Sequence, residues 1–145
     1  MVAEVHTADD YRYFLPITTR WMDNDVYGHV NNVTYYSYFD TVANHFLIRE
    51  GGLDIHTSPV IALVVESMCS YHAPVAYPDE LRAGLRVDKL GTRSVTYGTA
   101  IFTATGETAV AQGHFVHVFV DRETRKSTPI PDPIRTALAT LVAPS

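Results

Sequence analysis

The chain has 145 residues, of which 46% are hydrophobic and 19% charged, and its formal net charge is −5. This length and composition predict one globular domain with a single core. The negative charge argues against nucleic-acid binding, which needs a basic surface. The acidic start lacks the apolar run of a signal peptide, and the longest aliphatic run, Val60 to Val65, is too short to span a membrane. Because Cys69 is the single cysteine, no internal disulfide can form, and we expect a cytoplasmic protein.

The first part of the chain leads into an acidic loop. Residues 1–11 read as a loose leader of a single domain that spans residues 1–145. Tyr13 to Arg20 has the composition of a strand, which Pro16 confines to a sheet edge or a bulge. The loop follows from Trp21 to Asn31 and carries two aspartates.

The segment from about residue 32 to 50 has the apolar periodicity of a helix. Its apolar rows are wide and its polar side is narrow, so we expect a helix that is buried on most of its circumference. Asn31 or Asn32 can cap its start, and Gly51-Gly52 ends it. Backbone N–H groups at such a start can polarise a carbonyl oxygen. The apolar rows are Tyr35, Phe39, Val42 and Phe46, and Tyr36, Ala43 and Leu47; the polar residues are Ser37, Asp40, Thr41 and Asn44.

From residue 60 the apolar pattern changes to a period of two, which is typical of strands. A strand is predicted over residues 60–73, with one face formed by Ile61, Leu63, Val65, Cys69 and Tyr71. A turn at 74–79 precedes strands at 81–88, 95–104 and 109–120, and Asp132-Pro133 opens a short helix through Leu141. Sequential strands favour antiparallel pairing. The prediction is therefore an α+β fold, in which a curved, mostly antiparallel five-stranded sheet wraps one long central helix.

One motif stands out where the loop meets the helix: Asp23-x-Asp25-x-x-Gly28-His29-Val30-Asn31-Asn32-x-x-Tyr35. It resembles the signature of hotdog-fold acyl-CoA thioesterases of the 4-hydroxybenzoyl-CoA thioesterase type. Weaker similarity continues at residues 71–75, 79–81, 120–124 and 129–131. The resemblance implies the hotdog fold, which is the architecture that periodicity predicts. It also implies hydrolysis of an acyl thioester to a free acid and a thiol, no cofactor apart from the coenzyme A of the substrate, and a homodimer or homotetramer.

The resemblance assigns the chemistry to Asp25 and Asn32. In the family the second acid of the pair is catalytic, and that position here is Asp25, which would attack the thioester carbonyl or activate a water. Thiols ionise at a pKa of about 8.5, so the leaving group needs no strong general acid. The backbone N–H of Asn32 would polarise the carbonyl oxygen at the helix start. Asp23 is expected instead to hold the loop by hydrogen bonds.

Further residues are expected around the substrate. Gly28 permits a backbone conformation or a close approach that a side chain would block. His29 either bonds the loop or orients water or substrate. The predicted substrate-binding set is Gly28, His29, Val30, Asn31, Tyr35, Trp21 and Tyr27; candidates for the coenzyme A phosphates are Arg82, Arg86, Arg122 and Arg125.

Other polar residues are given structural roles. No metal site is predicted, because His114 and His117 are three apart in a strand and point to opposite faces. Asp40 is expected on the helix surface or at a subunit contact, and Glu66 as a support of the site or an interface residue.

Two alternatives to hydrolysis remain at this point. One is a hotdog hydratase or dehydratase that pairs Asp25 with His29 for proton transfer. The other is a hotdog module that binds an acyl thioester without turning it over. The sequence leaves open the acyl group and the choice between coenzyme A and acyl carrier protein. It also leaves open whether Asp25 is nucleophile or base.

Overall fold

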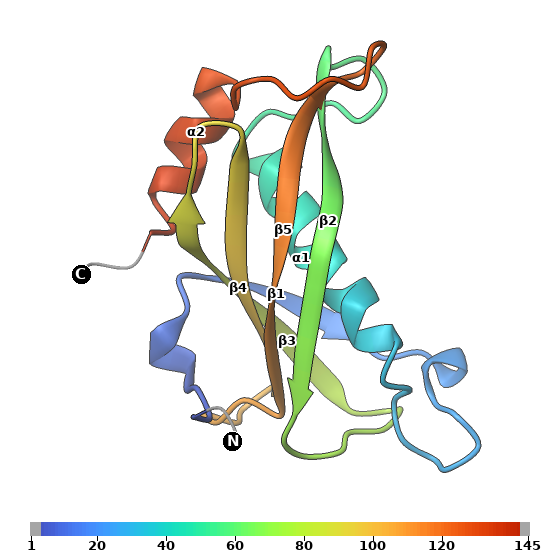
Figure 1. Cartoon of the computed structure of the whole chain (residues 1–145). Coiled ribbons are helices and arrows are strands. Elements are labelled where there is room, and N and C mark those ends of the chain that lie inside the picture. Colours follow the sequence, from blue (N-terminus) through green and yellow to red (C-terminus); the bar gives the residue numbers. More distant parts are fainter. Residues whose placement is uncertain (1–3, 143–145) are drawn as a thin grey trace.

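A computed structural model describes residues 4–142 and shows one sheet curved around one helix (Figure 1). All strand pairs are antiparallel, and the strand order is β1-β3-β4-β5-β2. The predicted α+β architecture, with its central helix and short C-terminal helix, is confirmed. The strands are β1 (Tyr13–Thr18), β2 (Val60–Tyr71), β3 (Glu80–Leu90), β4 (Ser94–Thr103) and β5 (Ala111–Asp121); the helices are α1 (Thr34–Arg49) and α2 (Asp132–Ala139).

Helix α1 supplies one side of the core. It begins at Thr34 rather than at residue 32, because Asn31 accepts the Val33 N–H with its side chain and the Thr34 N–H with its carbonyl. It ends where the Gly51 N–H bonds the Phe46 carbonyl, as the two glycines predict. Six of the seven residues of the predicted apolar rows are buried, whereas Tyr36 is only partly buried and Tyr38, outside the predicted rows, is buried. The buried side chains are Tyr35, Tyr38, Phe39, Val42, Ala43, Phe46 and Leu47.

Strand β2 lies at a sheet edge and departs from the predicted alternation. Its register against β5 shifts between Val64 and Glu66, which is a bulge. Ala62 before the bulge and Cys69 after it pack against the core. The prediction that Leu63 and Val65 share the face of Cys69 was therefore wrong: these two side chains are 37% and 61% exposed. A prediction based on strict alternation of side chains does not include the extra residue that a bulge inserts into a strand.

The connection from β2 to β3 was predicted as a turn at 74–79, yet β4 and β5 lie between these two strands. Residues 72–79, called here the crossing segment, therefore run across the end of the sheet. Val75 within it is buried. The crossing segment also forms part of the candidate active site.

The predicted loose leader was also wrong for the residues that the structure describes. Ala8–Asp10 form a turn of 3-10 helix, the Ala8 N–H donates to the Glu107 carbonyl, and Tyr11 is buried. Residues 4–11 thus belong to the domain, and the first three residues of the predicted leader lie outside the described part. Within residues 4–142 no helix combines the length and apolarity needed to cross a bilayer.

The two histidines of β5 face opposite sides, as predicted. His114 lies on the outer face with its Nε2 3.8 Å from a Glu66 carboxylate oxygen, whereas His117 is 1% exposed in the core. The Tyr97 hydroxyl and His117 Nδ1 share a hydrogen bond of 3.1 Å. Burial lowers the pKa of His117 to about 4.

This buried histidine predicts a pH dependence of folding. The folded state holds His117 neutral, so the unfolded chain binds the extra proton below pH 6.5, and stability falls by about 1.4 kcal/mol per pH unit down to about pH 4. His117→Phe should flatten this slope, whatever its absolute stability. Urea unfolding between pH 7.5 and 4.5 measures it. His56→Gln, at an exposed position, is the control that should keep the wild-type slope; equal slopes in all three proteins would contradict the assignment.

Candidate active site

The acidic loop, which in the structure is the whole connection of residues 19–33 between β1 and α1, is held from inside by Asp23. This side chain is almost fully buried, and its carboxylate accepts hydrogen bonds from the Tyr38 hydroxyl at 2.7 Å and from the backbone N–H and guanidinium of Arg20. Burial alone would raise the pKa of Asp23, but these donors together hold it below its usual range. The predicted structural role of Asp23 agrees with these contacts.

The crossing segment supports the loop from the other side. The Val30 N–H donates to the Val75 carbonyl at 2.8 Å, and the Tyr77 N–H donates to Asn24 Oδ1 at 3.0 Å. The Trp21 ring stands edge-on to the Tyr77 ring, with centroids 6.0 Å apart. Two segments about fifty residues apart in the sequence therefore form one platform.

Asp25 sits in a tight turn of this loop and is half-buried. Its N–H donates to the His29 carbonyl at 3.0 Å, and its own carbonyl accepts the Gly28 N–H at 3.0 Å. Gly28 has a φ of +85°, a conformation that favours glycine. Asp25 Oδ1 accepts the Tyr27 N–H at 2.8 Å, while Oδ2 has no hydrogen-bond partner among residues 4–142. One carboxylate oxygen thus stays available for chemistry.

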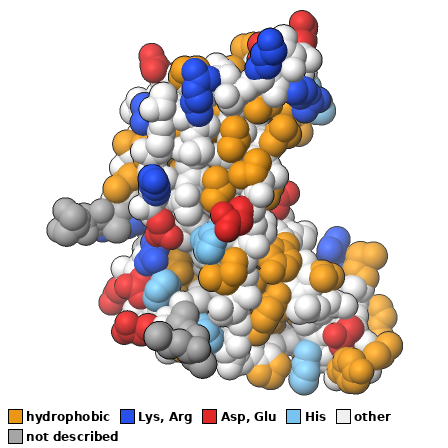
Figure 2. Space-filling model, in the orientation of Figure 1, with side chains coloured by type: hydrophobic (Ala, Val, Ile, Leu, Met, Phe, Trp, Pro, Cys, Tyr) orange, Lys and Arg blue, Asp and Glu red, His pale blue; other side chains and the backbone are white. Residues whose placement is uncertain are grey.

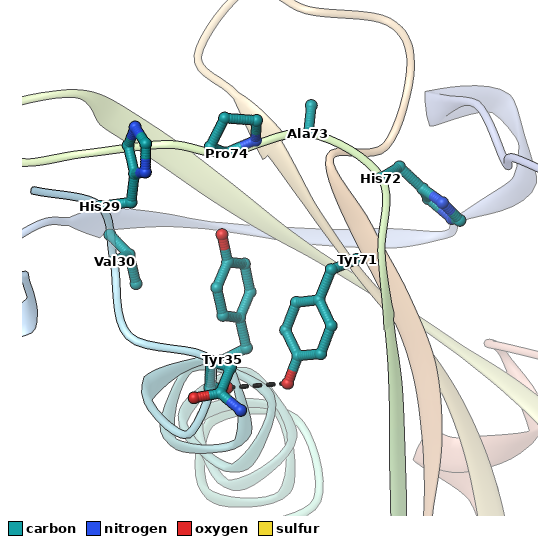
Figure 3. A pocket seen from close by; sticks show the side chains of 8 residues that line it. His29, Val30, Tyr35, Tyr71, His72, Ala73 and Pro74 are labelled. Carbon is teal, nitrogen blue, oxygen red and sulfur yellow. Dashed lines mark hydrogen bonds between the residues drawn. The ribbon is translucent and has the colours of Figure 1, made fainter. Parts of the chain in front are cut away.

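A cavity of about 290 Å³ lies where the loop, the start of α1 and the end of β2 meet (Figure 3). The predicted residues His29, Val30, Asn32 and Tyr35 line it together with Tyr71, His72, Ala73 and Pro74. Five other predicted site residues do not line it: Asp25, Gly28, Asn31, Trp21 and Tyr27.

Asn32 offers a free backbone donor beside this cavity. It lies in the turn just before α1, rather than within the helix, and its N–H has no acceptor among the described residues. Its carbonyl accepts the Tyr71 hydroxyl at 2.9 Å (Figure 3). Sequence reasoning placed Tyr71 on a strand face and missed this contact, because the partner lies 39 residues away. An unpartnered N–H at this place can polarise a carbonyl oxygen.

The loop also carries an exposed apolar tip, formed by Trp21, Met22, Val26 and Tyr27. The exposed fractions of Val26 and Tyr27 are 95% and 85%. Within one chain, Trp21 and Tyr27 therefore form no wall of an enclosed acyl pocket, although both were predicted to do so. Side chains of this kind are costly to leave in water, which suggests a contact beyond the single chain.

The four candidate phosphate-binding arginines do not lie beside the cavity in one chain. Arg82 and Arg86 bond neighbouring carbonyl or carboxylate groups and lie over aromatic rings. Arg122 donates to the carbonyls of the 55–58 loop, whereas Arg125 is exposed and its guanidinium has no hydrogen-bond partner among residues 4–142. The connection after β5, which carries Arg125, and the acidic loop lie at opposite ends of the molecule (Figure 1).

No group of three or more His, Cys, Asp or Glu side chains within residues 4–142 is arranged to hold a metal ion. Of the groups suited to acyl transfer, the Asn32 N–H lies beside the cavity, whereas the Asp25 carboxylate, with its free oxygen, belongs to the same loop but does not line the cavity.

Comparisons with known proteins identify the family and the fold of the chain. The model of the Thioesterase-like superfamily matches residues 19–138. The YsmA protein of Bacillus subtilis (strain 168) is 26% identical over 117 residues, which cover 81% of this chain and 78% of that protein. The PA5185 protein of Pseudomonas aeruginosa strain PAO1 is 51% identical, with a TM-score of 0.95 over 97% of this chain and 98% of that one. The 1,4-dihydroxy-2-naphthoyl-CoA thioesterase Slr0204 of Synechocystis shares the fold at 19% identity, with a TM-score of 0.78 over 88% and 95% of the two chains.

The contacts of Asp23 predict a loss of stability on its substitution. Asp23→Asn removes the charge that three donors share, and each hydrogen bond to a charged group contributes about 1.5–3 kcal/mol. We expect the free energy of unfolding to fall by about 2–3 kcal/mol in urea titrations. Asp25→Asn, on the same loop, is the matched control; because the Asp25 carboxylate is less buried and accepts only the Tyr27 N–H, this variant should lose clearly less stability than Asp23→Asn. Equal stability of Asp23→Asn and wild type would remove Asp23 as the anchor of the loop.

Proposed function

Since the chain belongs to the Thioesterase-like superfamily, we propose that it is an acyl-CoA thioesterase that hydrolyses an acyl thioester to a free acid and a thiol. One observation carries the proposal. Asp25, with its free Oδ2, and Asn32, with its free N–H, stand on the same short loop beside a cavity that is partly apolar. Hydrolysis of a thioester needs these two functions and little more.

The chemistry assigned to the two residues follows from their free atoms. The Asn32 N–H donates to the thioester oxygen, and this bond strengthens as negative charge develops there. The free Asp25 oxygen either takes a proton from a water that attacks the carbonyl carbon, or attacks that carbon itself to form an anhydride that water then cleaves. In both routes the carbon–sulfur bond breaks and a thiolate leaves, with a pKa low enough to need no strong acid.

The edge of the sheet supports a homodimer. Strand β2 presents unpaired backbone groups along its outer side, and edges of this kind are normally protected. Apolar side chains gather along β2 where the face of the molecule is hollowed (Figure 2). The exposed ones are Leu63, Val64, Val65, Met68 and Tyr71. We expect two copies to pair through β2 about a two-fold axis, which is the commonest symmetry of homo-oligomers.

Such pairing would complete the site. Strand β2 runs from Val60, at the end of the molecule that carries Arg125, to Tyr71 at the cavity (Figure 1). An antiparallel two-fold places the far end of the partner beside the cavity, because each Tyr71 then approaches the partner's Val60. The partner's Arg125 would in this way reach the acidic loop, where it can bind a coenzyme A phosphate. The same contact would cover the exposed apolar tip.

The central prediction concerns Asp25. Asp25→Asn should fold normally and lose thioester hydrolysis by about 100-fold or more, since general acid–base groups typically contribute 10²–10⁴-fold. Thiol release from short, medium, long and aromatic acyl-CoA thioesters measures it. Asp40→Asn is the control, because Asp40 is exposed on α1 and bonds only Asn44. Wild-type turnover by Asp25→Asn would exclude the mechanism, and hydration of an enoyl thioester without thiol release would favour the hydratase alternative.

The dimer predicts a second outcome. Val65→Asp places a charge on the exposed edge and should convert the wild-type dimer to a monomer in light scattering at micromolar concentration, with a parallel loss of hydrolysis. Val142→Asp, at an exposed apolar position that bridges Val87 of β3, should leave the dimer intact, because β4 and β5 separate β3 from β2. A monomeric wild-type protein with full activity would contradict the composite site.

A further inference from the structure

Tyr35 differs from the other buried tyrosines of the described chain in having an unused hydroxyl. It is 3% exposed, and its hydroxyl has no hydrogen-bond partner among residues 4–142. The other three all bond: Tyr11 to the Thr99 carbonyl, Tyr38 to Asp23, and Tyr97 to His117. Two enclosed side-chain atoms of the described chain lack a partner, His72 Nε2 and Thr99 Oγ1, and the Tyr35 hydroxyl is not one of them. Although the Tyr35 side chain is buried, its hydroxyl therefore opens onto a space that a ligand can enter.

The direction of the Tyr35 ring identifies the space that its hydroxyl faces. The ring extends from the start of α1 into the cavity, so that its hydroxyl lies toward the wall formed by Pro74 (Figure 3). The ring of Tyr71 stands edge-on to it at 5.2 Å between centroids, but the Tyr71 hydroxyl points the other way, to the Asn32 carbonyl. Val30 and Ala73 add apolar surface. The Tyr35 hydroxyl therefore points into a part of the cavity whose wall combines apolar surface with the polar side chain of His29.

The hydroxyl can act only as a neutral group near neutral pH. Burial raises the pKa of Tyr35 to about 12, so the proton stays on the oxygen and is available for donation. Two free donors thus face one cavity: the Asn32 N–H at the start of the helix and the Tyr35 hydroxyl farther out along the ring. Under the proposed function the first binds the thioester carbonyl. The second then calls for another acceptor on the same substrate.

We infer that Tyr35 is a specificity-determining residue, whose hydroxyl donates a hydrogen bond to an oxygen on the acyl group beyond the thioester carbonyl. This inference rests on the proposed thioesterase function. The preferred substrates are acyl thioesters that carry a hydroxyl or keto oxygen.

Matched pairs of substrates test the inference. The kcat/KM of the wild type is compared for butyryl-CoA and 3-hydroxybutyryl-CoA, and for benzoyl-CoA and 4-hydroxybenzoyl-CoA. We expect a preference of about tenfold for the oxygenated member of at least one pair, the size expected of one hydrogen bond. Tyr35→Phe should abolish this preference, so that the two members of the pair have equal kcat/KM in that variant. Tyr13→Phe is the matched control, since its hydroxyl bonds His45 at 2.7 Å outside the cavity, and it should keep the preference.

The possible outcomes test the role of Tyr35 separately from the proposed thioesterase function. A wild type without preference in either pair, or a Tyr35→Phe variant that keeps the preference, overturns the role of Tyr35 while thiol release still supports the proposed function. The wild-type comparison needs no variant, so it stands even if Tyr35→Phe folds poorly. Absence of thiol release from every thioester overturns the proposed function and this inference with it.

Discussion

Burial of helix α1 is the constraint on which the rest of the structure depends. The helix is apolar on most of its circumference, and the curved sheet is the surface available within the chain to cover it. Burying the residues of one such helix yields roughly 1.5–3 kcal/mol for each large apolar side chain. The sheet must therefore bend around the helix. The remaining surface of the helix is a narrow polar side with Ser37, Asp40 and Thr41, together with the helix ends, and the acidic loop lies at one of these ends.

At that end two aspartates two residues apart have opposite roles. Asp23 is buried, and its charge is neutralised by Arg20 and hydrogen-bonded by Tyr38, so its carboxylate is committed to the fold. Asp25 turns outward and keeps one oxygen free. The fixed position of Asp23 allows Asp25 to act in catalysis. The turn through Gly28, which orients Asp25, keeps one geometry only if the loop beneath it is held rigidly. The same anchoring positions the N–H of Asn32, because the preceding residue, Asn31, donates its N–H to the Asp23 carbonyl.

Local pattern predicted the elements of this fold better than their pairing. Apolar spacing placed α1 within two residues, because a helix satisfies its hydrogen bonds within its own segment. The bulge in β2 and the crossing segment depend instead on pairing with β5, some fifty residues away, which no local pattern encodes. The residues of the site show the same contrast between local and distant segments. His29, Asn32 and Tyr35 follow from one motif, whereas Tyr71 and Pro74 reach the cavity from a distant segment.

Three features remain unexplained by a single chain, and one two-fold axis would account for them together. The tip of the acidic loop exposes large apolar side chains, β2 leaves an apolar edge, and the free cation Arg125 lies at the end opposite to Asp25. Each feature alone has several explanations. Antiparallel pairing of β2 would cover the edge, bury the tip and bring the cation to the carboxylate in the same contact. A site shared in this way would also explain why Asp25 does not line the cavity of its own chain, since the remaining wall would come from the second copy.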